Sequence, residues 1–196
     1  MEEFSLTPTL PKKLYDMIEE DVTNLHIDLG LSIPIVPKDI AHALGYEIFY
    51  LSEYNSKEIQ STFRSEEGVS IDGLSFINPN TGTFQIWVND VDIQNPNHDD
   101  FTIMHEVGHI RMGHKVRSPL AEIIANYYAA YALVPSPLPT IYGCETFIDI
   151  ANVFNTSESC AYNCIDRINR WAWYGGAIKP YEQRLITYYK KVARRR

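Results

Sequence analysis

Two histidines and a glutamate fall within five consecutive positions near the middle of this chain, in the stretch MHEVGH. His105 and His109 are four residues apart, so on an α-helix their imidazole rings lie on one face, one turn from each other. Zinc binds imidazole nitrogens at ~2.0–2.1 Å, and such a pair supplies two of its ligands. Glu106 can reach a water molecule that the metal acidifies, take its proton and pass it to a leaving amine. The spacing therefore predicts a hydrolytic zinc site.

The alternative explanation is a solvated polar face on an ordinary helix. Apolar residues surround the motif, however, among them Ile103, Val107 and Ile110, so two histidines in this helix need a reason. Gly108 costs helix stability, about 1 kcal/mol relative to Ala. We expect its missing side chain to allow close packing of a neighbouring element.

A hydrolytic zinc site needs a third protein ligand and one open position. His114 follows His109 by five residues, and on a continuing helix it would point well away. We expect it at the surface or behind a ligand. Glu122 lies in the nearly uncharged segment AEIIANYYAAYAL. A carboxylate there is costly unless it is paired or metal-bound, although it could instead interact with the helix dipole. Because the upstream histidines lack a third ligand, we favour Glu122 as the ligand.

The surrounding pattern predicts helices on both sides of a small group of strands. Apolar spacing and proline positions indicate helices over 11–28, 37–44, from Asp99 or Asp100 through the histidine motif, 119–134, 147–154, 157–173 and from Pro180 onward. Strand-like runs cover 46–51, 70–77 and 83–88, and NPNTG suggests a hairpin between the last two. Residues 89–100 read as a loop. The fold class is therefore α+β, with a small antiparallel sheet or hairpin on a mainly helical core.

Composition excludes several classes of protein. With 45% apolar residues the chain is globular, and its net charge of −8 disfavours general nucleic-acid binding. The basic run KKVARRR reads as a solvated tail. The apolar helix ending at Pro135 is too short to span a bilayer. No export signal is visible and the cysteines are few (Cys144, Cys160 and Cys164), so we expect a cytoplasmic protein.

Three stretches resemble the ImmA/IrrE family of metallopeptidases: FTIMHEVGH, EIIANYYAAYALVP and IDGLSFINPNTGTFQIWVN. A weaker likeness continues through DIANVFNTSESCAYNCIDRI. One departure is Ile124, which stands where the family has a second acidic residue. The resemblance covers most of residues 35 to 170.

The resemblance implies a gluzincin-like zinc site in a zincin-like core, with His105, His109 and Glu122 as ligands and Glu106 as general base. It also implies a protein substrate, a helix-turn-helix repressor whose cleavage relieves repression, in a bacterium, phage or mobile element. We expect residues 1–135 to form the metallopeptidase core and residues 136–196 a helical extension continuous with it.

Two other functions stay open. Residues 150–165 echo a helix-turn-helix pattern, which would suit a DNA-binding regulator. Against this, the second helix begins SESCAYNC, with an acid and no base. A partner-binding module with a metal site is the other alternative, but such a module has no use for Glu106. Tyr127, Tyr128 and Tyr131 lie near the metal helix in sequence, where one could donate to an oxyanion, although packing is the commoner role.

Overall fold

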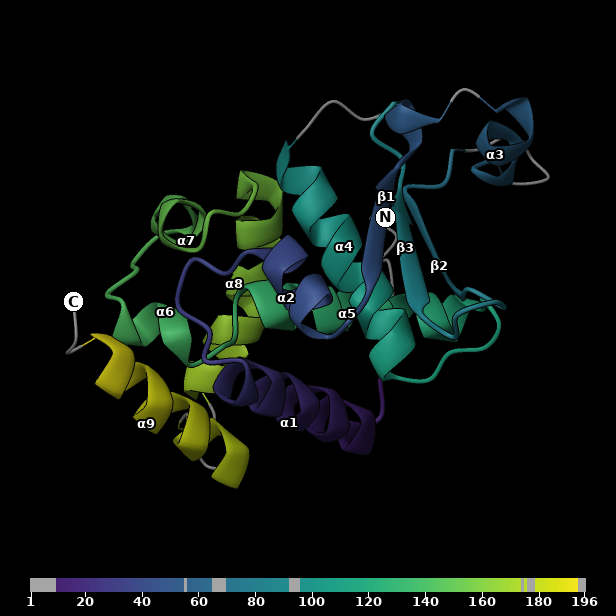
Figure 1. Ribbon diagram of the computed structural model, residues 1–196. Helices are drawn as coiled ribbons and strands as arrows, with labels where there is room; N and C mark the ends of the chain where they lie inside the picture. The colour runs from purple at the N-terminus through teal and green to yellow at the C-terminus, as the bar shows by residue number, and fades with distance from the viewer. Residues whose placement is uncertain are drawn as a thin grey trace, which may run out of the picture.

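The computed structural model describes residues 10–54, 56–64, 70–91, 96–173, 175 and 179–193, and within them it shows an α+β fold (Figure 1). The helices are α1 (Lys12–Asp28), α2 (Pro37–Ala43), α3 (Lys57–Thr62), α4 (Pro96–Arg111), α5 (Pro119–Leu133), α6 (Leu138–Ile141), α7 (Phe147–Phe154), α8 (Glu158–Trp173) and α9 (Pro180–Ala193), with a 3-10 turn, η1 (Leu51–Glu53). The strands are β1 (Glu47–Tyr50), β2 (Gly73–Ile77) and β3 (Phe84–Val88). The predicted fold class is confirmed. Residues 92–95 of the predicted loop and 194–196 of the basic tail lie outside the described residues.

The three strands form one mixed sheet in the order β1-β3-β2. The predicted hairpin is confirmed: β2 and β3 are antiparallel, and Asn78 N–H donates to the Thr83 carbonyl at 2.9 Å beside the turn. The third strand, β1, instead runs parallel to β3, with Glu47 opposite Gln85. After β1 the chain passes through η1 and α3 and enters the sheet at its far edge, so β2 runs opposite to both other strands.

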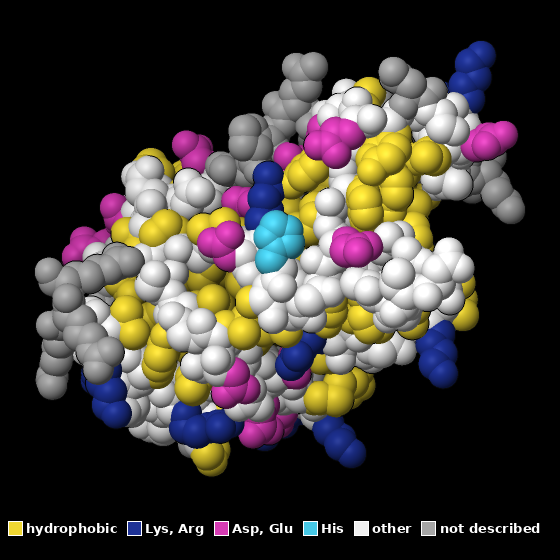
Figure 2. Space-filling view, viewed as in Figure 1, with side chains coloured by type: hydrophobic (Ala, Val, Ile, Leu, Met, Phe, Trp, Pro, Cys, Tyr) yellow, Lys and Arg dark blue, Asp and Glu magenta, His cyan; other side chains and the backbone are white. Residues whose placement is uncertain are grey.

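One face of the sheet packs on α4. Ile86 and Val88 are completely buried on that face, and Ser75, which pairs with Ile86 in register, hydrogen-bonds to a side chain of α4. On the other face the Trp87 ring stacks with Phe49 at 4.8 Å, as alternation along a strand requires. Apolar side chains gather over the sheet end of the molecule in Figure 2.

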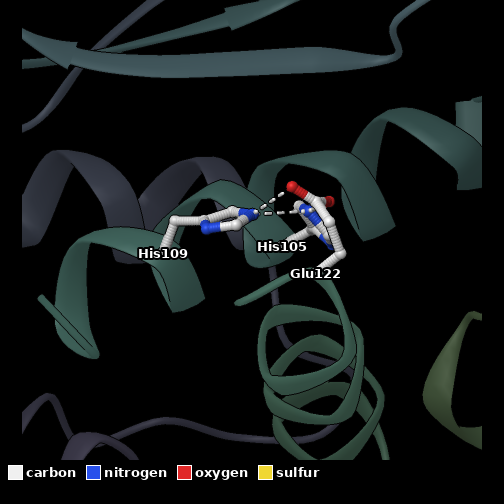
Figure 3. A group of neighbouring side chains, drawn as sticks. All are labelled: His105, His109 and Glu122. Carbon is white, nitrogen blue, oxygen red and sulfur yellow. Dashed lines mark hydrogen bonds and ion pairs between the residues drawn. The ribbon is translucent and has the colours of Figure 1, made fainter. Parts of the chain in front are cut away.

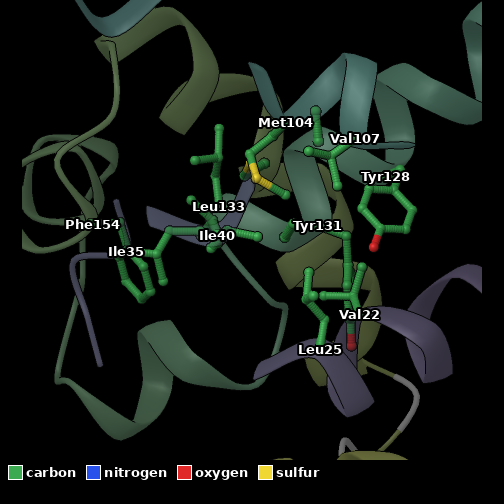
Figure 4. Packing of buried hydrophobic residues seen from close by; sticks show 14 of the residues in the cluster. Val22, Leu25, Ile35, Ile40, Met104, Val107, Tyr128, Tyr131, Leu133 and Phe154 are labelled. Carbon is green, nitrogen blue, oxygen red and sulfur yellow. The ribbon is translucent and has the colours of Figure 1, made fainter. Parts of the chain in front are cut away.

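The core forms where α4, α5 and α1 meet. Figure 4 shows Met104 and Val107 of α4 among side chains from the other two helices, including Val22 of α1 and Tyr131 of α5. The same cluster of buried residues runs from Leu10 to Tyr189 and so contains residues from both sides of position 135. The division of the chain at 135 stays a prediction.

Among the described residues, one helix boundary differs from the prediction by more than one residue, and two short helices were not predicted. Helix α4 begins at Pro96 rather than at Asp99 or Asp100, because proline is well suited to the first helical position. Helix α3 was not predicted, and it buries none of its side chains, so it has no apolar pattern to detect. The single turn of α6 was not predicted either.

Candidate metal centre

Helix α4 presents both histidines on one face, as their spacing predicts. The Nε2 atoms of His105 and His109 are 2.9 Å apart, and their rings meet edge to face. Figure 3 shows both rings turned toward Glu122, which comes from α5. The two helices thus direct three donor groups at one point.

Helix α5 reaches the histidines because it packs closely against α4. A Cβ atom at Gly108 would lie 2.9 Å from the Cβ of Tyr128, so no side chain fits between the helices. The expected role of this glycine in close packing is confirmed. At the start of α5, the Ser118 hydroxyl accepts a hydrogen bond from Ala121 N–H at 3.1 Å. This cap fixes the first turn of the helix, which carries Glu122.

The three donors fit a tetrahedral metal ion. Glu122 Oε2 lies 3.2 Å from His105 Nε2, and Glu122 Oε1 lies 3.5 Å from His109 Nε2. Ligands at ~2.0–2.1 Å from a tetrahedral ion stand about 3.3 Å apart. The separations of 3.2 and 3.5 Å lie close to that value, and the 2.9 Å between the two histidine Nε2 atoms is somewhat shorter. Glu122 Oε1 is buried and has no hydrogen-bond partner among the described residues. His105, His109 and Glu122 therefore form a group that could hold a metal ion.

His109 is held in the form that binds metals. Its side chain is buried, and burial, followed by the nearby His105, lowers the pKa of His109 to about 4. The imidazole is therefore neutral near pH 7, and a metal can bind it without first displacing a proton.

Each histidine is oriented through its second ring nitrogen. The Nδ1 atom of His105 lies 2.9 Å from Asn126 Oδ1, and the Nδ1 atom of His109 lies 2.9 Å from His114 Nδ1. The expectation that His114 points away from His109 is wrong. Helix α4 ends at Arg111, and the chain then turns back at Gly113, whose φ is 68°. His114 contacts the predicted ligand His109 and stands outside the group of three donors.

Glu106 is buried beside the three donors, with only 1% of its surface exposed. Its Oε2 accepts a hydrogen bond from the Ser75 hydroxyl at 2.6 Å, and its Oε1 accepts one from Arg117 Nη2 at 3.1 Å. The same Arg117 nitrogen donates to the Gly73 carbonyl at 2.5 Å. Burial raises the pKa of Glu106, and the hydrogen bond from Ser75 and the charges of His105 and Arg117 oppose that rise. The Glu106 carboxylate is thus fixed in place next to the three candidate metal ligands.

Three residues of this site were missed by sequence reasoning. Asn126 is four residues after Glu122 on the same helix, so its spacing could have indicated that it faces the histidines. Ser75 and Arg117 carry no such signal, because a strand and an irregular connection bring them to Glu106.

A cavity of about 300 Å³ opens next to the site, lined in part by His105, Glu106 and Glu122. None of the three tyrosines considered as oxyanion donors lines this cavity. Tyr127 donates to Glu19 at 2.6 Å and Tyr128 to Asp21 at 2.9 Å, both on α1, so these hydroxyls join helices.

No protein-family model and no curated protein sequence matches this chain. Within the described residues, no helix is both long enough and apolar enough to cross a membrane.

Proposed function

We propose that this protein is a zinc-dependent metalloendopeptidase. The observation that carries the proposal is the convergence of His105, His109 and Glu122 next to the buried carboxylate of Glu106. Two imidazoles and a carboxylate suit zinc and leave one coordination position for chemistry. A site that only stabilised the fold would gain nothing from a fixed, buried carboxylate beside it.

A zinc ion held by these residues would polarise the scissile carbonyl and acidify a water molecule. Glu106 would take a proton from the water whose oxygen attacks the carbonyl carbon, and would deliver it to the amine nitrogen as the C–N bond breaks. Ser75 and Arg117 hold the Glu106 carboxylate in position. Asn126 and His114 fix the two imidazole rings, so that the donors are aligned before substrate binds.

The resemblance to the ImmA/IrrE family supports a protein substrate, a helix-turn-helix repressor whose cleavage relieves repression in the cytoplasm of a bacterium. A suitable test substrate would be any small helix-turn-helix protein encoded next to this chain.

Substitution of Glu106 by Gln tests the mechanism, because Gln keeps the shape of the side chain but cannot take a proton. We expect Glu106→Gln to retain zinc and to slow cleavage by about 10²–10⁴-fold. Glu145→Gln, at an exposed position outside the site, is the matched control and should cleave normally. Undiminished cleavage by Glu106→Gln would refute the role of Glu106.

The alternative is a regulatory protein that binds DNA or a protein partner without proteolysis. Helices α7 and α8 do form a helix pair, joined through Asn155 in a left-handed conformation. The exposed charged residues of α8 are Glu158, Asp166 and Arg170, which gives no basic surface for phosphates. A specific, salt-dependent gel shift that survives Glu106→Gln would favour this alternative.

A further inference from the structure

A second cavity, of about 350 Å³, lies among α1, α5, α8 and the start of α9. It shares no lining residue with the cavities beside the metal centre. Its volume falls within the range of about 300–1,000 Å³ that is usual for small-molecule sites. The cavity therefore has room for a small ligand that does not touch His105, His109 or Glu122.

Flat aromatic side chains form much of the wall. Tyr15 of α1 and Tyr127 of α5 meet edge to face with ring centroids 4.6 Å apart, and Trp171 of α8 also lines the cavity. Leu10 adds an aliphatic side chain. Walls of this kind favour a ligand with a planar apolar body.

The carboxylates in the wall are already satisfied. Glu19 accepts hydrogen bonds from Tyr127 at 2.6 Å, Tyr181 at 2.8 Å and Lys179 at 2.9 Å. Glu182 accepts from the indole N–H of Trp171 at 2.9 Å. Because these donors occupy both carboxylates, neither is free to recognise a cationic ligand.

Two arginines in the wall have no carboxylate partner among the described residues, although the Cys164 thiol interacts with Arg167. Within the described part of the chain, neither Arg167 nor Arg170 forms an ion pair with a carboxylate. Arg167 Nη2 donates to the carbonyls of Ala130 and Val134 at the end of α5, and its Nη1 is buried without a hydrogen-bond partner among the described residues. Within the same described residues, Arg170 forms one hydrogen bond, from its Nε to the Asp166 carbonyl at 3.2 Å. A carboxylate stabilises a buried guanidinium more strongly than a neutral acceptor does, because it is charged and can accept two hydrogen bonds.

We propose that this cavity binds a small organic carboxylate with a planar apolar body. Arg167 and Arg170 supply the countercharge, while Tyr15, Tyr127 and Trp171 enclose the apolar part. Because the carboxylates in the wall are already paired and the two arginines lack a carboxylate partner among the described residues, the cavity favours an anion over a cation, although the chain as a whole carries a net charge of −8.

The probes are benzoate, 2-naphthoate and indole-3-acetate, each compared with its neutral carboxamide by calorimetry or ligand-observed NMR on the full chain. We expect at least one carboxylate to bind about tenfold more tightly than its amide. Arg170→Gln, an exposed position, should weaken that binding about threefold, and Arg167→Met about tenfold. Arg184→Gln removes an exposed arginine that pairs with Glu20 outside the cavity, and it should change nothing.

Arg167→Met also removes hydrogen bonds at the end of α5 and could unfold the protein. Arg170→Gln and the comparison of carboxylates with amides therefore test carboxylate binding without relying on that variant. Equal binding of carboxylates and amides would overturn the proposal. So would an equal loss in Arg170→Gln and Arg184→Gln, or no binding of any probe at about 5 mM.

Discussion

Substituting Gly108 by Ala probes the contact that brings α5 to the histidines. The added Cβ would lie 2.9 Å from the Cβ of Tyr128 and 3.1 Å from its Cγ. Tyr128 has little freedom to move, because it is completely buried and its hydroxyl donates to Asp21, which also pairs with Arg111.

Two opposing effects determine how much Gly108→Ala changes the free energy of unfolding. Ala favours the helix by about 1 kcal/mol relative to Gly. Overpacking a well-packed core costs about 1–3 kcal/mol, and here the clash involves the immobile base of a ring. Because the base of the Tyr128 ring cannot move aside, we take the upper part of that range, about 2–3 kcal/mol. Subtracting the helix gain of about 1 kcal/mol, we expect Gly108→Ala to lower the free energy of unfolding by about 1–2 kcal/mol, where an exposed helical Gly→Ala would raise it.

Urea unfolding of the zinc-free protein measures this directly. Asn152→Ala, at an exposed position in α7, is the control, and we expect it to leave the free energy of unfolding unchanged or slightly raised. If Gly108→Ala proved as stable as the parent protein, the close α4–α5 contact described above would be wrong.

Three further predictions concern the site and the core. Asn126→Ala should weaken zinc binding about 10–100-fold, measured by competition with a chelating dye, because His105 loses its orienting partner; unchanged affinity would contradict this. Gly73→Ala should destabilise the protein by about 1–3 kcal/mol in urea and reduce cleavage, since its Cβ would lie 2.5 Å from Thr102 Cγ2 and 3.2 Å from Glu106 Oε1. Burial lowers the pKa of His26 to about 4, so as the pH falls from about 6.5 to about 4 the unfolded chain takes up the proton first and stability drops by about 3 kcal/mol. His26→Gln should lose that part of the pH dependence of unfolding, and an identical pH profile would disprove it.

Those parts of the site that depend on regular helix geometry could be predicted from the sequence. His105 and His109 share a face because their spacing matches one helical turn. The solitary carboxylate of Glu122 in an apolar helix was an energetic anomaly, and the structure places it beside both histidines. Gly108 was likewise an anomaly within a helix, and Tyr128 occupies the space it leaves.

What could not be predicted depends on where irregular segments travel. His114 was placed on a continuing helix, but the chain turns at Gly113 and brings it back to His109. Arg117 reaches Glu106 from the connection between α4 and α5, for which no periodicity exists. The parallel pairing of β1 with β3 depends on a crossover, and strand periodicity alone does not reveal the pairing partner.

The most direct test of the central claim is zinc-edge anomalous diffraction from crystals of the zinc-loaded protein. We expect one strong peak within about 2.0–2.2 Å of His105 Nε2, His109 Nε2 and a Glu122 carboxylate oxygen. A peak coordinated by His114 instead of Glu122, or no peak at this position, would contradict it.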